Sequence, residues 1–224
     1  MKSDVQIQKD VMEELKWEPT LSSSQIGVAA KEGVVTLAGM VDTYLQKLSA
    51  ERAAKRVAGV KAVAEDLMVG PSAGHAKTDA EIAAAALNAL KWNSAVQDEK
   101  IKLKVESGIV TLEGEAEWEY QRAQAKRSVE ALSGVKLVLN LINLKPKITA
   151  EDVEQKISAA FQRHASIDSK AIHVSVTGNR ITLTGKVRSF REKDDAAEAA
   201  WAAPGVTSVK NDLSIEIPEY AFDN

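Results

Sequence analysis

One sequence pattern occurs three times along the chain, and this repetition constrains the fold more than any other feature. The segment GVVTLAG at residues 33–39 recurs as GIVTLEG at 108–114 and as NRITLTG at 179–185. The last glycines of these segments are 75 and 71 residues apart, and 20 residues after each one comes a Gly-Val pair: Gly59-Val60, Gly134-Val135 and Gly205-Val206. Repetition at this period predicts copies of one small supersecondary unit.

Each copy is expected to begin with a helix. Three hydroxyl residues fall in register, and each is followed three residues later by an acid or an amide: Ser3 with Gln6, Thr78 with Glu81, and Thr149 with Asp152. This spacing is typical of a capped helix start. An apolar stripe at i, i+4 and i+8 follows in every copy: Ile7, Val11, Leu15; Ile82, Ala86, Leu90; Val153, Ile157, Phe161. The stripe predicts one buried face per helix.

A hairpin, a second helix and a last strand complete each copy. Apolar alternation begins at Ile26, Ile101 and Ile172, and turns are predicted at 31–33, 106–108 and 177–179, where Gly and Asn can adopt positive φ. Second helices are predicted over 45–58, 120–133 and 191–203, before the Gly-Val pairs. The predicted fold class is α+β: three tandem α-β-β-α-β domains, each a three-stranded mixed sheet with two helices on one face.

The same register sets the predicted domain boundaries and the structural glycines. Repeat 1 covers residues 1–70, a linker 71–77, repeat 2 78–145, a short linker 146–148, repeat 3 149–217 and a tail 218–224. The glycines expected to hold turns and helix ends are Gly33, Gly39, Gly59, Gly108, Gly114, Gly134, Gly178, Gly185 and Gly205. In the third turn Asn179 stands where Gly33 and Gly108 stand in the others.

The element order, the V-T-L-x-G strand ending and the later G-V-x-x-V with a trailing Leu resemble the BON domain of bacterial osmotic-stress and nodulation-related proteins. The resemblance implies a non-catalytic module that associates with phospholipid surfaces and protects membranes under osmotic or envelope stress. Well-known relatives with several such modules are periplasmic and carry a signal peptide. A cytosolic relative binds potassium, so the resemblance also implies a small-ligand or potassium sensor as an alternative. A structural scaffold is a third.

Composition narrows the classes of function and location. A net charge of -3 and a pI near 5.8 argue against a nucleic-acid-binding protein, which needs a basic face. There is no cysteine, and the charged N-terminus lacks the apolar core of a signal peptide, so a cytoplasmic location is expected. No apolar run approaches the length of a transmembrane segment. The oligomeric state is left open.

Catalytic, cofactor-binding and metal-binding residues are not predicted. Without cysteine, the near-neutral titrating side chains are His75, His164 and His173, and none recurs between copies. His164 and His173 lack carboxylates at ligand spacing, so solvated or hydrogen-bonded structural roles are the favoured interpretation. The chain is therefore expected not to be an enzyme.

Repeat 2 contains the candidate lipid-binding residues. Lys100, Lys102 and Lys104 alternate with apolar residues along the first strand and are expected on the open face of the sheet. Such a row attracts anionic head groups, and it equally protects an edge strand from aggregation. Trp92 and Trp118 suit a membrane interface, although capping of an Ala-rich core is the favoured interpretation for them. The leading hypothesis is a non-enzymatic stress-related protein that binds an anionic phospholipid surface or a protein partner.

Overall fold

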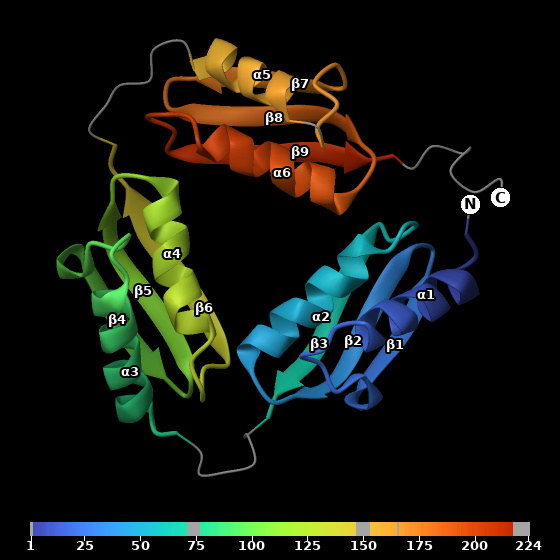
Figure 1. Cartoon of the computed structure of the whole chain (residues 1–224), viewed down its shortest axis with the longest axis horizontal. Coiled ribbons are helices and arrows are strands. Elements are labelled where there is room, and N and C mark those ends of the chain that lie inside the picture. Colours follow the sequence, from blue (N-terminus) through green and yellow to red (C-terminus); the bar gives the residue numbers. More distant parts are fainter. Residues whose placement is uncertain (1, 71–76, 147–152, 165, 217–224) are drawn as a thin grey trace. The chain divides into compact units, whose positions relative to one another are not determined.

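Three copies of one architecture make up the described part of the chain. The structure, a computed structural model, describes residues 2–70, 77–146, 153–164 and 166–216. In every repeat two helices cover one face of a three-stranded sheet and leave the other face open (Figure 1). This arrangement confirms the predicted fold class. Each repeat is described by itself below.

The helices and strands follow the same order in each repeat. Repeat 1 contains α1 (Asp4–Lys16), η1 (Ser23–Gln25), β1 (Ile26–Lys31), β2 (Val34–Val41), α2 (Tyr44–Arg56) and β3 (Ala62–Val69). Repeat 2 contains α3 (Asp79–Trp92), η2 (Asp98–Lys100), β4 (Ile101–Glu106), β5 (Ile109–Ala116), α4 (Glu119–Glu130) and β6 (Leu137–Leu144). Repeat 3 contains α5 (Val153–Arg163), β7 (Ile172–Thr177), β8 (Arg180–Val187), α6 (Phe190–Trp201) and β9 (Ser208–Ile215).

The second strand of each repeat is the central strand of its sheet. The strand orders are β1-β2-β3, β4-β5-β6 and β7-β8-β9. In repeats 1 and 3 the hairpin pair is antiparallel and the last strand is parallel to the central one, with Ile26 opposite Gly39 and Val34 opposite Ala62 in repeat 1. A parallel neighbour requires a crossover, and the second helix provides it. Alternation in the sequence predicts strands but not this order.

The predicted caps form at the two helix starts that are described. Ser3 Oγ accepts a hydrogen bond from the backbone N–H of Gln6 at 3.2 Å. Thr78 and Glu81 form a full capping box at the start of α3. Thr149 and Asp152, predicted to do the same in repeat 3, lie outside the described residues.

A carboxylate in the first turn of the first helix holds the hairpin turn. Asp4 accepts hydrogen bonds from the backbone N–H groups of Glu32 at 2.8 Å and of Gly33 at 3.1 Å. Asp79 accepts the equivalent bonds from Ser107 at 2.7 Å and Gly108 at 2.9 Å. These bonds fix the helix against the far end of the hairpin. In repeat 3 the sequence has Ala150 in this register.

The hairpin turns are of two kinds, which corrects the expectation that Asn179 adopts positive φ. In repeats 1 and 2 both central residues do so: Glu32 at 55° and Gly33 at 81°, Ser107 at 53° and Gly108 at 82°. In repeat 3 Gly178 has φ 59°, and Asn179 is not among the positive-φ residues of the described chain. With glycine moved to the first central position, the turn changes from type I′ to type II′.

The second helices end earlier than predicted, at Arg56, Glu130 and Trp201. The residues before each Gly-Val pair form tight turns instead. In repeat 1 the N–H of Val57 donates to the Ala54 carbonyl, and that of Val60 donates to the Val57 carbonyl, both at 3.2 Å. The apolar, Ala-rich sequence there continues the helical pattern, but the chain must already reverse toward the last strand.

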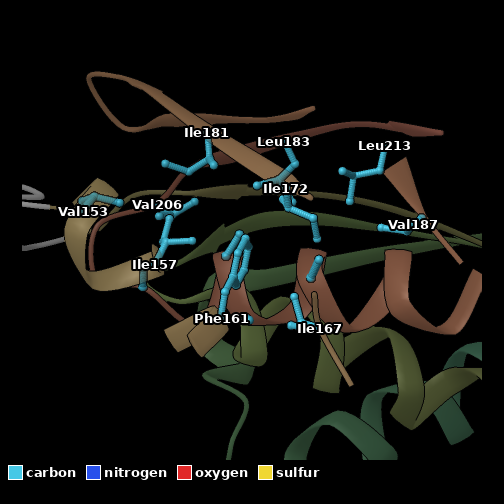
Figure 2. Packing of buried hydrophobic residues seen from close by; sticks show 14 residues of the cluster. Val153, Ile157, Phe161, Ile167, Ile172, Ile181, Leu183, Val187, Val206 and Leu213 are labelled. Carbon is cyan, nitrogen blue, oxygen red and sulfur yellow. The ribbon is translucent and has the colours of Figure 1, made fainter. Parts of the chain in front are cut away.

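A small apolar core lies between the helices and the sheet of each repeat. The predicted stripes are buried, and Val11, Ala86 and Ile157 are completely inaccessible. In repeat 3 the core is built around Phe161 on α5, which faces Ile172 of β7 and Ile181 and Leu183 of β8 (Figure 2). Alanines of the second helix, such as Ala196 and Ala200, are also fully buried. Their small side chains let the helix lie close to the sheet.

All nine glycines singled out in the sequence have positive φ. The most constrained are Gly39, Gly114 and Gly185, with φ from 127° to 135°. A Cβ atom at Gly185 would lie 2.1 Å from the carbonyl oxygen of Ala171 on the neighbouring chain segment. Only glycine can hold this close approach, which explains why each V-T-L-x-G segment ends as it does.

Candidate functional site

The lysine row of repeat 2 lies where the alternation predicts but is accompanied by carboxylates. Lys102 and Lys104 are exposed on β4, on the face away from the helices, whereas Lys100 ends the short helix η2. Lys104 Nζ lies 2.6 Å from Glu106 Oε2, and this hydrogen bond raises the pKa of the lysine. Lys102 lies opposite Glu113 of β5. The open face therefore offers an anionic membrane a mixed surface rather than a positive one.

Trp92 and Trp118 lie in different surroundings. Trp92 is the last residue of α3 and is 87% exposed. Trp118 is half-buried before α4, where its backbone N–H donates to Gln121 Oε1 at 3.0 Å. The neighbour of Trp92, Asn93, donates a hydrogen bond from its side chain to Ser128 near the other end of α4, at 2.9 Å. The two tryptophans therefore flank opposite ends of α4 and do not form one cluster.

The outward half of α3 is an apolar surface that the sequence analysis did not single out. Leu87 is 56% exposed, and Lys91 and Trp92 are also exposed. At 100° per residue, Leu87 and Trp92 flank this half of the helix and Lys91 lies between them. No acidic residue occurs between Glu81 and Asp98. The signal was present in the sequence as the apolar positions left over after the buried stripe is assigned.

The same positions differ between the three first helices. Helix α1 exposes Met12 and Trp17, and its outward half also contains Glu13. Repeat 3 has Ser158 and Arg163 in this register. The exposed apolar pair is therefore a property of repeats 1 and 2 and is not required by the fold.

The histidines that are described do not form a site. His164 follows α5, and His173 lies on β7 opposite Thr184, both exposed. His75 lies outside the described residues. Within residues 2–70, 77–146, 153–164 and 166–216, no group of three His, Asp or Glu side chains is placed to hold a metal ion.

Two partly or fully buried carboxylates have structural surroundings. Glu192 is 3% exposed and accepts hydrogen bonds from the backbone N–H groups of Asp168 and Arg188, both at 2.8 Å, so it caps α6. Burial raises the pKa of Glu65 above its ordinary value, against the opposing attraction of Lys47, whose Nζ lies 3.8 Å from the carboxylate. Neither carboxylate has a nucleophile or a second acid placed for catalysis.

None of the helices in the described part of the chain is long and apolar enough to cross a bilayer.

Comparison with solved structures finds three low-similarity matches. CdsD, a structural protein of the type III secretion system of Chlamydia trachomatis, is 16% identical, with a TM-score of 0.28 over 95% of this chain and 93% of that chain. The periplasmic domain of PrgH is 10% identical, with a TM-score of 0.21 over 87% of this chain and 96% of that one. TM-scores this low carry no argument about fold or function.

Comparison with known sequences identifies the family. The osmotically-inducible protein Y of Escherichia coli (strain K12) is 31% identical over 133 residues, which is 56% of this chain and 64% of that protein. The chain thus matches less than two thirds of the length of this relative. The model of the BON domain matches residues 3–71, 78–146 and 149–216, nearly the whole described chain. The chain belongs to the BON domain family and contains three BON domains in tandem.

Proposed function

We propose that this chain is a non-enzymatic binding protein of the osmotic or general stress response, and that its BON repeats bind anionic phospholipid surfaces. The observation that carries the proposal is Trp92, 87% exposed at the end of α3 beside Leu87 and Lys91. The osmotically inducible relative supports the stress role. The cytoplasmic location expected from the sequence belongs to this proposal and is tested by cell fractionation.

The chemistry of the α3 surface favours a membrane over a protein partner of defined shape. An indole ring is stabilised at the boundary between head groups and acyl chains, because it combines an apolar body with a polar N–H. Leu87 adds apolar area, and a lysine near an anionic surface contributes about 1 kcal/mol. One such helix binds weakly. Met12 and Trp17 of α1 provide a second contact, and linkage of two weak contacts in one chain raises the overall affinity.

The proposal is tested by co-sedimentation with vesicles of phosphatidylglycerol and phosphatidylcholine, with pure phosphatidylcholine vesicles as the lipid control. The variant L87S/W92S removes the apolar pair, and both side chains are exposed, so the fold is retained. We expect a loss of at least about fivefold in apparent affinity, or roughly 1 kcal/mol. The matched variant K102A/K104A changes the open sheet face, and little effect is expected.

Two outcomes contradict the proposal. Binding that L87S/W92S leaves unchanged excludes the α3 surface, and loss of binding only in K102A/K104A assigns the contact to the sheet. If the wild-type chain does not bind the anionic vesicles, the lipid function itself is wrong and a protein partner takes its place.

A further inference from the structure

Strand β6 is an edge strand without a single charged residue. Its sequence, LVLNLINL, pairs only with β5 in the sheet order β4-β5-β6. Val138 and Ile142 face the helices and are buried. Leu137, Leu139 and Leu141 alternate with them on the open face and are 36%, 42% and 57% exposed.

The fold does not require leucine at these three positions. In the same register, β3 has Ala62, Ala64 and Asp66, and β9 has Ser208, Lys210 and Asp212. Ile109 of the neighbouring β5 is also partly exposed, at 36%, on this face. We call Ile109, Leu137, Leu139 and Leu141 the leucine face. Exposed contiguous apolar side chains on an uncharged edge strand are typical of a surface that binds another strand.

We propose that β6 pairs antiparallel with β6 of a second copy of this chain, centred on Leu139, so that two repeat 2 sheets form one six-stranded sheet. In this register Leu139 lies opposite Leu139 of the second copy, and Leu137 lies opposite its Leu141. Residues directly opposite in an antiparallel pair project from the same face, so the two leucine faces become continuous. The pairing has two-fold symmetry and therefore closes as a dimer.

The charges of the edge strands favour a second copy on β6 and oppose one elsewhere. The same antiparallel pairing of β9 would place Lys210 opposite Lys210, and like charges directly opposite each other are destabilising. The other edge of the repeat 2 sheet, β4, has Lys102 and Lys104 exposed. Strand β6 has no charge that repels its own copy, so the segment is self-complementary.

The contact is small for a stable dimer. Specific interfaces bury about 1,200–2,000 Å² in total, and one strand pair with its leucines lies at or below the lower limit. We therefore expect a concentration-dependent equilibrium between monomer and dimer.

The first experiment measures the mass of the full chain by sedimentation velocity over a concentration series. We expect the wild type to shift from 24.1 kDa toward about twice that mass as concentration rises. The variant L139K/L141D places on β6 the residues that β9 has as Lys210 and Asp212, so this strand type is known to accept them. We expect this variant to remain monomeric, with an unchanged circular dichroism spectrum.

The second experiment tests the register by cross-linking, since the chain has no cysteine of its own. Opposed residues of an antiparallel pair lie about 4.5–5.5 Å apart between Cα atoms, within the range for a disulfide. L139C is expected to form a covalent dimer on oxidation, and A64C, the matched position on β3, is not.

Three results overturn the proposal. They are a wild type that stays at 24.1 kDa, a dimer that L139K/L141D leaves intact, and a dimer lost in that variant without any cross-link through Cys at 139. The last result assigns the contact to stacking of the leucine faces instead of strand pairing. If L139K/L141D reduces vesicle binding while the wild type is monomeric, the leucine face belongs to a lipid contact.

Discussion

Single carboxylates fix the first helix of repeats 1 and 2 to the hairpin, and at this scale the copies differ most sharply. Asp79 accepts two backbone hydrogen bonds from the turn residues Ser107 and Gly108. Each bond is formed by an ionised acceptor, and hydrogen bonds to charged groups are stronger than those between neutral groups.

We predict that Asp79→Ala lowers the free energy of unfolding of repeat 2 by about 1–3 kcal/mol, because two turn amides lose their acceptor. Hydrogen exchange of peptides from β4 and β5 measures the loss within the full chain. Asp98→Ala removes an exposed acid of the same repeat and serves as the control. Equal protection in both variants would contradict the role of Asp79.

Glu65 predicts a pH dependence of repeat 1. Burial is the largest influence on this carboxyl and raises its pKa above the ordinary value of 4.5, while Lys47 lowers it and Glu51 raises it. The folded state thus holds the proton more tightly than the unfolded chain. Its contribution to stability is fully present below about pH 4.5 and is lost as the pH rises through the folded pKa.

Glu65→Gln removes the titration, so we expect this variant to be more stable than the wild type at neutral pH. The difference should shrink as the pH falls toward 4.5. Lys47 keeps a partner in the variant, because its Nζ also donates to the Leu67 carbonyl at 2.8 Å. Exchange of β3 peptides between pH 4 and 8 checks the trend, and a difference independent of pH would refute it.

At the scale of the elements, the hairpin of repeat 3 contains two glycines with very different constraints. A Cβ atom at Gly185 would lie 2.1 Å from a backbone oxygen, whereas none of the atoms compared lies within 4 Å of a Cβ at Gly178. We predict that Gly185→Ala destabilises repeat 3 by more than about 3 kcal/mol, and Gly178→Ala by about 1–2 kcal/mol through its φ of 59° alone.

Exchange of β7 and β8 peptides compares the two variants directly. Each retains the rest of the hairpin, so every variant is a control for the other. Similar losses in both would mean that the close approach of Gly185 to Ala171 is not what fixes this glycine.

The elements themselves were predictable because each rests on a local signal. Ser3 and Thr78 marked helix starts, and the spacing of Ile7, Val11 and Leu15 marked the buried face. Strand order was not predictable, because alternation in β3 and β9 gives no information about which strand they join. The Asp79 contacts were missed for the same reason, since they join residues 28 and 29 positions apart.

The candidate site was predicted only in part. Trp92 is exposed as a membrane contact requires, but Glu106 and Glu113, which offset the lysine row, come into register only when β4 meets β5. The exposure of Leu87 depends on which side of α3 meets the sheet.

At the scale of the whole molecule, the three BON domains share a frame and differ on their surfaces. Repeats 1 and 2 expose Trp17 and Trp92, and repeat 2 alone has the leucine face. Repeat 3 has Arg163 and Lys210 in the corresponding registers. The proposed membrane contacts and the proposed dimer contact therefore lie on different faces of the repeats, so one chain can form both.

The position of the last strand in each repeat also governs how the chain is made. Every described sheet pairing lies within one repeat, and in repeats 1 and 3 the last strand joins the central strand in parallel. A ribosome releases the N-terminal domain first, and a domain folds as a unit once its residues are available. Each BON domain thus completes its sheet only when its final strand leaves the exit tunnel. The domains mature one after another, and an unfinished copy never needs a strand from its neighbour.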